Sequence, residues 1–178
     1  MHNSITTALP RRLGRLALAG LVVSGLFALT PTGTAPASAT TAHHRIHHGA
    51  QPYRAKVDRE HRALRIALKH RGAPYRYGAA GPHAFDCSGL TSFAFHRAGF
   101  RHLPRTSAAQ SRFVHRIPRR RMRPGDLVFF YDGSGVYHVG VFDGIHHGRR
   151  YIVHAPYSGS RVRREAIWTS SWFAGTLR

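Results

Sequence analysis

The sequence predicts an α+β domain in which helices come first and an antiparallel sheet follows. Apolar residues recur at helical spacing after residue 53, and from residue 127 onward they occur in short, alternating runs. Gly, Pro and Asp-Gly dipeptides bound these runs. Grouped helices followed by grouped strands are typical of an α+β domain, whereas a parallel sheet would alternate the two.

Residues 1–39 are expected to precede that domain as a secretory signal peptide that is removed on export. Three arginines within residues 11–15 give a basic start, residues 16–29 form an apolar run, and Ala-Ser-Ala at 37–39 fits a cleavage site. The apolar run is shorter than the roughly 20 residues of a membrane span. The arginine pair at the start also fits the twin-arginine pathway, so the export route stays open.

Three helices are expected next. Residues 40–53 contain HHRIHH and no apolar period, which predicts a flexible lead-in to a domain over residues 54–178. The first helix is predicted over 54–71, where Gly72 stops it. After a loop rich in Gly and Pro, a second helix is predicted from 87 to about 97, and Thr106-Ser107 can cap a third that runs through Arg116.

The period then changes to that of strands. Alternating or apolar runs at 127–131, 136–142 and 151–155 predict three strands, and 162–168 and 173–178 predict weaker ones. The segment DGIHHG between the second and third runs predicts a hairpin connection.

The charge of the chain is strongly positive. There are 27 Lys and Arg against 7 Asp and Glu, a formal net charge of +20 at pH 7. Such an excess indicates polyanionic surroundings, which for an exported protein are envelope polymers rather than nucleic acid. A merely solvated arginine surface is the other interpretation, and both stay open.

Cys87, in the stretch FDCSGL, is the only cysteine, so the chain cannot form an internal disulfide. It stands where a glycine-rich loop enters the second predicted helix. A helix N-terminus carries partial positive charge and free N–H groups, which favour a thiolate and can bind an oxyanion. Ser88 and Gly89 keep this turn small, so that a substrate chain can approach. A packing residue or an intermolecular link are the alternatives to a reactive thiol.

Two histidines on the predicted sheet can supply a base. Alternation puts His138, Gly140 and Phe142 on one face of their strand, and His154 shares a face with Ile152. A hairpin centred on residue 146 would set His138 directly opposite His154, about 5 Å apart at Cβ. One ring would then orient the other, which completes a nucleophile, a base and an orienter. A one-residue slip would break the pairing, and strand histidines also serve as structural donors.

The chain resembles the NlpC-type family of bacterial cell-wall peptidases in five blocks with the family's order and spacing: GAPYRYGAAGPHAFDCSGLTSFAF, LPRTSAAQ, RPGDLVFF, HVGVF and IVHAP. The resemblance covers about residues 54–175. It implies a compact papain-like α+β fold and hydrolysis of amide bonds in peptidoglycan stem peptides, typically the D-γ-glutamyl bond to a diamino acid. The implied mechanism is of the cysteine type and needs no metal or cofactor.

Carried over residue by residue, the resemblance makes Cys87 the nucleophile, His138 the general base and His154 the residue that orients the base. Tyr75 matches a tyrosine that lines the site and helps to bind the oxyanion. The positions expected to contact the free amino end of a stem peptide are Asp86, Ser88 and Arg105.

The chain departs from the family where Tyr77-Gly78-Ala79 replaces a tryptophan and two glycines, which leaves substrate preference open. We expect a secreted, extracellular or wall-associated monomer that acts on peptidoglycan stem peptides. Anionic cell-wall polymers are candidate further partners, and neither nucleic acid nor stable membrane insertion is expected. The alternatives are an amidase or acyltransferase on the same fold, or a non-catalytic wall or metal binder that uses HHRIHH and His146-His147.

Overall fold

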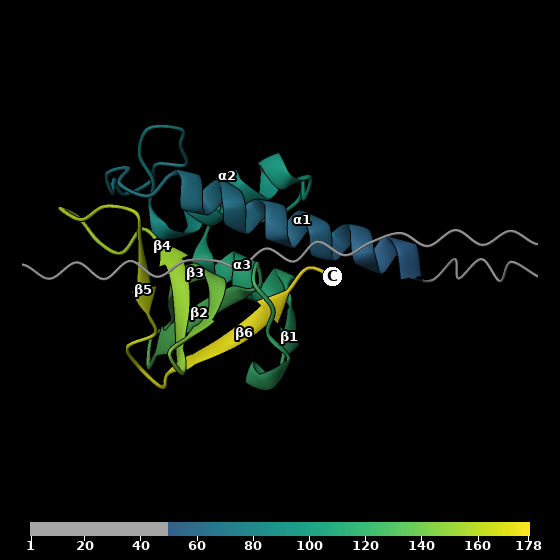
Figure 1. Cartoon of the computed structure of the whole chain (residues 1–178). Helices are drawn as coiled ribbons and strands as arrows, with labels where there is room; N and C mark the ends of the chain where they lie inside the picture. The colour runs from purple at the N-terminus through teal and green to yellow at the C-terminus, as the bar shows by residue number, and fades with distance from the viewer. Residues whose placement is uncertain (1–49) are drawn as a thin grey trace, which may run out of the picture. The chain divides into compact units, whose positions relative to one another are not determined.

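The computed structural model describes residues 50–178, so the predicted signal peptide and the HHRIHH segment lie outside the described residues. Within this range the helices come first: α1 (Ala50–Lys69), α2 (Cys87–Ala98) and α3 (Ser107–Phe113). The strands follow, with the short 3-10 turn η1 between the first two: β1 (His115–Ile117), η1 (Arg119–Arg121), β2 (Leu127–Asp132), β3 (Gly135–His146), β4 (Arg149–His154), β5 (Arg163–Ala166) and β6 (Trp172–Thr176). This order confirms the predicted α+β class (Figure 1).

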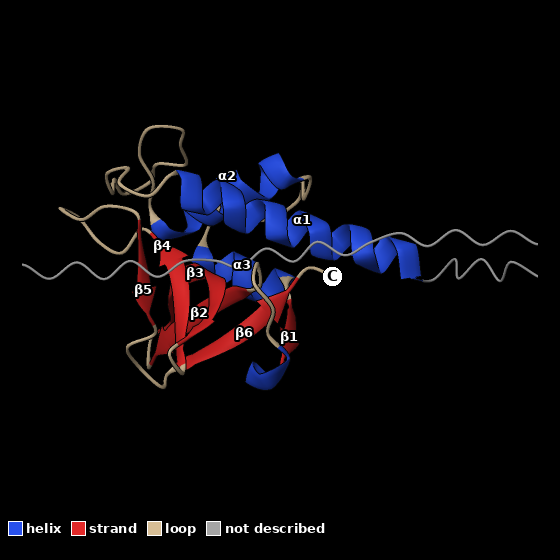
Figure 2. Ribbon diagram, in the orientation of Figure 1, coloured by secondary structure: helices blue, strands red, loops and turns tan. Residues whose placement is uncertain are grey.

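The strands form one sheet in the order β1-β6-β2-β3-β4-β5, and every neighbouring pair is antiparallel. Figure 2 shows α1 and α2 lying together along one side of this sheet. The hairpin of β3 and β4, the fourth and fifth strands in this order, carries both candidate histidines.

Alternation along the strands divides the apolar side chains between two clusters. Phe129 and Val139 pack with the helices, whereas their chain neighbours Val128 and Phe130 belong to a second cluster. Because successive strand residues point to opposite faces, the second cluster lies on the face turned away from the helices. The first cluster is the larger one and includes Leu90 and Phe95 of α2, so it fixes the helix that begins at Cys87.

Several element boundaries differ from the sequence prediction, and β3 runs to His146 instead of residue 142, so that part of the predicted hairpin connection is strand. Helix α1 begins at Ala50, ahead of the predicted start at residue 54. The third helix ends at Phe113 instead of Arg116, because residues 115–117 pair with the end of β6 as strand β1. None of the helices in the described range has the length and apolar character that a bilayer span requires.

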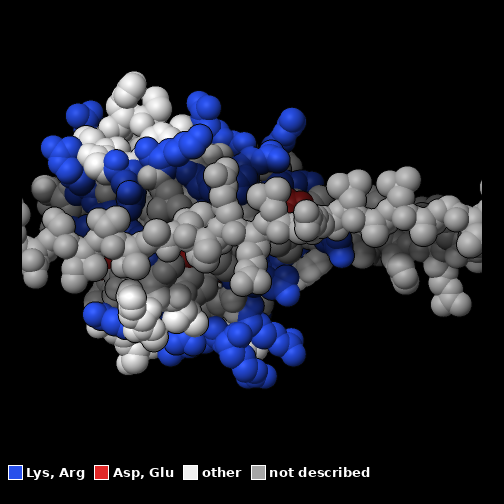
Figure 3. All heavy atoms as spheres, viewed as in Figure 1, with Lys and Arg blue, Asp and Glu red and all other residues white. Residues whose placement is uncertain are grey.

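The surface is dominated by basic side chains, which Figure 3 shows over much of one face. Most of the seven acidic residues are engaged by arginines instead of standing free. The pairs are Asp86–Arg105, Asp143–Arg164, Glu165–Arg163, and Arg178 with both Glu60 and Asp126. The last of these is buried and joins the C-terminal residue to α1.

Candidate active site

Cys87 is the first residue of α2, as predicted, and its thiol is free and partly buried. Asp86 caps the helix, since its Oδ1 accepts a 2.6 Å hydrogen bond from the backbone N–H of Gly89. The backbone N–H of Val139 in β3 interacts with the sulfur. Because Val139 directly follows His138, the fold brings the thiol to the strand that carries the first histidine.

The loop between α1 and α2 approaches the start of α2 closely. A Cβ at Gly89 would lie 2.0 Å from the carbonyl oxygen of Ala79, so only glycine fits at this position. Gly89 therefore allows the loop to pack against the helix start. From the sequence, this glycine was instead expected to make room for a substrate chain. Within the loop Gly78 takes the positive φ of 77°, and Ala79 does not. The alanine at the departure from the family pattern is therefore compatible with the loop.

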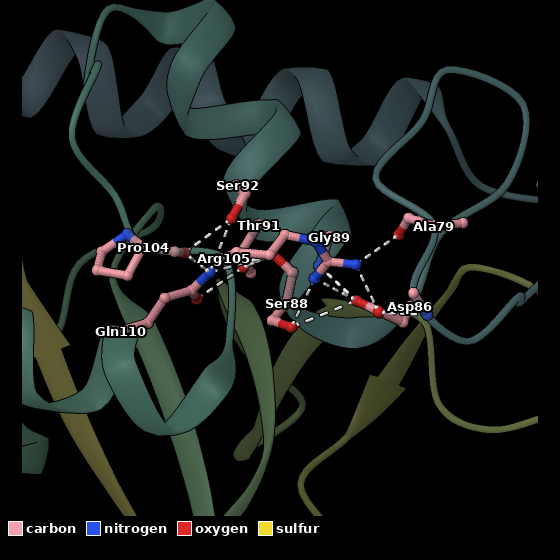
Figure 4. Close-up of polar contacts among 10 residues, drawn as sticks. Ala79, Asp86, Ser88, Gly89, Thr91, Ser92, Pro104, Arg105 and Gln110 are labelled. Atoms are coloured by element: carbon pink, nitrogen blue, oxygen red, sulfur yellow. Dashed lines mark hydrogen bonds and ion pairs between the residues drawn. The ribbon is translucent and has the colours of Figure 1, made fainter.

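Arg105 connects this loop to the helix start, as Figure 4 shows. Its Nη2 donates to Oδ2 of Asp86 at 2.7 Å, and its Nη1 donates to Oδ1 of Asp86 and to Ser88 Oγ, both at 3.0 Å. Oδ2 of Asp86 also accepts from the backbone N–H of Gly78 at 2.8 Å. The three residues predicted to contact a free amino end therefore form one cluster, in which the carboxylate already accepts several hydrogen bonds.

The two histidines share a face, but they are not directly opposite each other. The ladder pairs Val141 with Val153 and Phe142 with Ile152, which places His154 across from Gly140 and makes His138 its diagonal neighbour. The predicted register, centred on residue 146, was therefore wrong by two residues. The rings still meet: Nε2 of His138 lies 2.8 Å from Nδ1 of His154.

Gly140 lets β4 side chains pack closely against β3 at this position. A Cβ at Gly140 would lie 3.3 Å from the Cβ of His154, and 2.8 Å from Cδ1 of Ile152. The missing side chain therefore leaves room for Ile152 and for the Cβ of His154. Both rings are almost completely buried, with exposed fractions of 5% for His138 and 1% for His154.

Glu165 is a polar member of the site that the sequence analysis did not identify. Its Oε2 lies 3.0 Å from Nε2 of His154 and accepts a 2.8 Å hydrogen bond from Nε of Arg163. The ladder between β4 and β5 sets Glu165 opposite Ile152, so it is a diagonal neighbour of His154 on the same face. The only sequence signal was the weak strand at 162–168, which gave no partner for its acid.

A groove with two halves runs past Cys87. One half, a cavity of about 480 Å³, contains Cys87, His138 and Glu165 and is walled by the exposed aromatic rings of Tyr137, Tyr157 and Trp168. The other half, of about 490 Å³, shares Tyr75, Cys87 and Tyr137 with the first. Its remaining polar lining includes Asp86, Ser88 and Arg105. The thiol thus lies where a chain crossing the groove would pass from one half to the other.

Burial determines the resting charges of the site. It raises the pKa of the Cys87 thiol, and the negative charge of Asp86 raises it further. It also lowers the pKa of His138 to about 3 and that of His154 to about 4. At neutral pH the site therefore rests as a thiol beside two neutral imidazoles. This differs from the thiolate favoured by the helix-terminus argument, because desolvation outweighs the helix dipole here.

Nucleophilic acyl transfer requires a thiol, a neutral imidazole as base, and a polar partner at the other nitrogen of that imidazole. Cys87, His138 and His154 are groups of these kinds. Within residues 50–178 no three His, Cys, Asp or Glu side chains gather closely enough to hold a metal ion. The HHRIHH segment of the metal-binding alternative lies outside the described residues.

Comparison with known proteins identifies related chains. The sequence profile of the NlpC/P60 family matches residues 72–178. A probable endopeptidase p60 of Listeria welshimeri is 51% identical over 106 residues, which cover 60% of this chain and 19% of that protein. This chain therefore spans about a fifth of the length of that relative.

Solved structures share the fold. The NlpC/p60 domain of the peptidoglycan hydrolase SagA is 28% identical with a TM-score of 0.59, and the match covers 66% of this chain and 98% of that domain. RipD of Mycobacterium tuberculosis, described as a non-catalytic NlpC/p60 protein adapted to peptidoglycan binding, is 21% identical with a TM-score of 0.57. That match covers 67% of this chain and 98% of RipD.

Proposed function

Because this chain belongs to the NlpC/P60 family of peptidoglycan endopeptidases, we propose that it hydrolyses an amide bond in peptidoglycan stem peptides with Cys87 as the nucleophile. The observation that carries the proposal is that Cys87 and His138 line one cavity, and that a second buried histidine holds the ring of His138 at 2.8 Å. A site built only for binding has no need of a buried imidazole pair beside its one thiol.

The proposed reaction begins with proton transfer from the thiol of Cys87 to His138, which acts as general base. The thiolate attacks the carbonyl carbon of the scissile amide. The backbone N–H of Cys87, with the hydroxyl of Tyr75 at the cavity wall, stabilises the tetrahedral oxyanion. Protonated His138 then donates its proton to the leaving amine, and a water molecule hydrolyses the thioester to release the acid and regenerate the thiol. His154 orients the base throughout.

We assign the D-γ-glutamyl bond to the diamino acid as the cleaved bond. The groove supports this assignment because it has a separate half on each side of Cys87, as an endopeptidase that holds both parts of a peptide requires. Asp86, Ser88 and Arg105 line one half and are the proposed contacts for a free amino end. Asp86 would share its oxygens between that amine and Arg105.

The proposed place of action is outside the membrane, after removal of residues 1–39, with residues 54–178 as the catalytic domain. We further propose that the basic surface binds anionic wall polymers. Arg120, Arg121 and Arg123 are exposed and line a cavity of about 600 Å³ that lies apart from the candidate active site. Since most acidic side chains are already paired, these guanidinium groups are available for an external anion.

Digestion of defined muropeptides tests the function. Cys87→Ala and Cys87→Ser should each lower peptide release by at least about 10³-fold, because removal of a nucleophile leaves only binding and oxyanion stabilisation. One equivalent of an alkylating reagent should inactivate the wild type, since the chain has a single cysteine. Thermal unfolding of the variants checks that the fold survives.

Mass spectrometry of the released fragments separates the alternatives. A cut inside the stem peptide supports the proposal. A cut at the sugar-to-alanine amide indicates an amidase, and a transferred acyl group indicates an acyltransferase. Full activity of a folded Cys87→Ala variant would rule out the mechanism, and wall binding without any cleavage by the wild type would point to a binding protein.

A further inference from the structure

The candidate active site continues beyond the two histidines as a chain of hydrogen bonds across three neighbouring strands. His138 in β3, His154 in β4 and Glu165 in β5 are joined at 2.8 Å and 3.0 Å. Each is the diagonal neighbour of the next on one face of the sheet. The chain ends at a carboxylate, whose other contact is the 2.8 Å bond from Arg163.

The carboxylate determines where the protons of this chain lie. Both rings are neutral at neutral pH, so each carries one N–H and one lone pair. An ionised carboxylate only accepts hydrogen bonds, so Nε2 of His154 must be the protonated nitrogen that donates to Glu165. Nδ1 of His154 then has the lone pair and accepts from Nε2–H of His138. The remaining nitrogen of His138, Nδ1, is left without a proton.

We propose that Glu165 is a positioning residue that selects the tautomers of both histidines, so that His138 carries its free lone pair on Nδ1, the nitrogen not engaged by His154. The consequence for catalysis rests on the proposed function, because only this tautomer can take a proton from Cys87 through the free nitrogen. In the reversed chain His154 would donate from Nδ1, His138 would carry its proton on Nδ1, and no base would remain for the thiol.

The surroundings of Glu165 keep it in the accepting form. Burial alone would raise its pKa, but hydrogen bonds from Arg163 and His154 lower it below its usual value. Arg163 donates to Glu165 at 2.8 Å, and its guanidinium carbon lies over the ring of Tyr157 at 5.5 Å from the centroid. Trp168 covers the chain from outside, since its ring stacks on that of His154 with centroids 5.4 Å apart. The polar groups around Glu165 thus support one direction of the chain.

Nitrogen-15 NMR of the histidine rings in the resting protein tests this proposal without substrate. The wild type should show His138 and His154 as Nε2–H tautomers at neutral pH. Glu165→Gln keeps the shape but supplies an amide that can donate or accept, so both directions become possible and the spectra should show mixed tautomers. Peptide release should fall by about 10- to 100-fold in this variant, as expected when a base loses its preferred tautomer.

Asp132→Asn is the matched control, because it also converts an acid to an amide but at the exposed end of β2, where the carboxylate accepts its own hydrogen bonds from Ser134. It should change neither the tautomers nor the activity. If Glu165→Gln does not fold, Arg163→Met tests the same chain. That variant should keep the wild-type tautomers at pH 7 and lose them at a higher pH than the wild type during acidification, since removal of Arg163 raises the pKa of Glu165.

A proton on Nδ1 of His138 in the wild type would overturn the proposal, and so would unchanged tautomers in Glu165→Gln. The proposed function fails by a different route, through muropeptide digestion that does not depend on Cys87. Because the spectra are recorded without substrate, a protein that proved to be a pure wall binder would still give a decisive answer about the tautomers.

Discussion

The buried histidine pair should make this domain acid-sensitive well above the pH at which its carboxylates titrate. In the folded chain burial lowers the pKa of His138 to about 3 and that of His154 to about 4, whereas an unfolded histidine titrates near about 6.5. The unfolded state therefore binds protons first as the pH falls. Stability is fully present above the unfolded pKa and is lost as the pH falls from there toward the folded values.

The size of the loss follows from these values. Between pH 7 and pH 5 each ring accounts for about 2 kcal/mol, because the unfolded form is largely protonated at pH 5 and the folded form is not. The pair together accounts for about 4 kcal/mol, a large part of the roughly 5–15 kcal/mol that stabilises a typical domain. Burial alone would raise the pKa values of Glu165 and Asp86, but hydrogen bonds from arginine lower both below their usual values. These two acids therefore affect stability only at a pH below this window.

Urea unfolding at pH 7, 6 and 5, followed by tryptophan fluorescence, measures the effect. The free energy of unfolding of the wild type should fall by about 4 kcal/mol across this range. His138→Gln should lose only about half as much, since one imidazole remains. His83→Gln, at an exposed loop position, should behave as the wild type does. Equal pH dependence in the wild type and His138→Gln would refute the argument that the ring is buried in neutral form.

Two further predictions concern Gly140 and the basic surface. Gly140→Ala should destabilise the fold by about 1–3 kcal/mol and lower peptide release, because its Cβ would press on Ile152 and His154. Denaturant unfolding measures the first effect and muropeptide digestion the second. Unchanged values would contradict the close contact at this position. Replacement of Arg120, Arg121 and Arg123 by Gln should weaken binding to a purified phosphodiester wall polymer by about 10-fold or more at low salt and flatten its salt dependence. The control replaces three other exposed arginines, Arg62, Arg65 and Arg71, and should have a smaller effect. An equal effect would show that the binding depends only on total charge.

The class of fold and the nature of the site could be predicted because both depend on short-range patterns. The start of a helix at Cys87 follows from the loop and the capping aspartate before it. Strand alternation alone places His138 and Gly140 on one face. In contrast, β1 could not be predicted, because its three residues form a strand only by pairing with β6 at the far end of the chain. Glu165 is similar, since its partner His154 is chosen by the register between two strands.

The shared face of the two histidines depends on a feature that no local pattern predicts. Next to their connecting turn, β3 and β4 pair Ile145 with Arg150 and Gly144 with Tyr151. If this pairing continued regularly along the strands, His138 and His154 would point to opposite faces of the sheet. A bulge between Phe142 and Gly144 inserts one residue and shifts the ladder to the register that pairs Phe142 with Ile152. The predicted register and the observed one differ by an even number of residues, so they agree about the face and disagree about which residues are opposite. The imidazole pair therefore depends on one extra residue in β3, and Gly144, with its φ of 128°, supplies the backbone conformation for it.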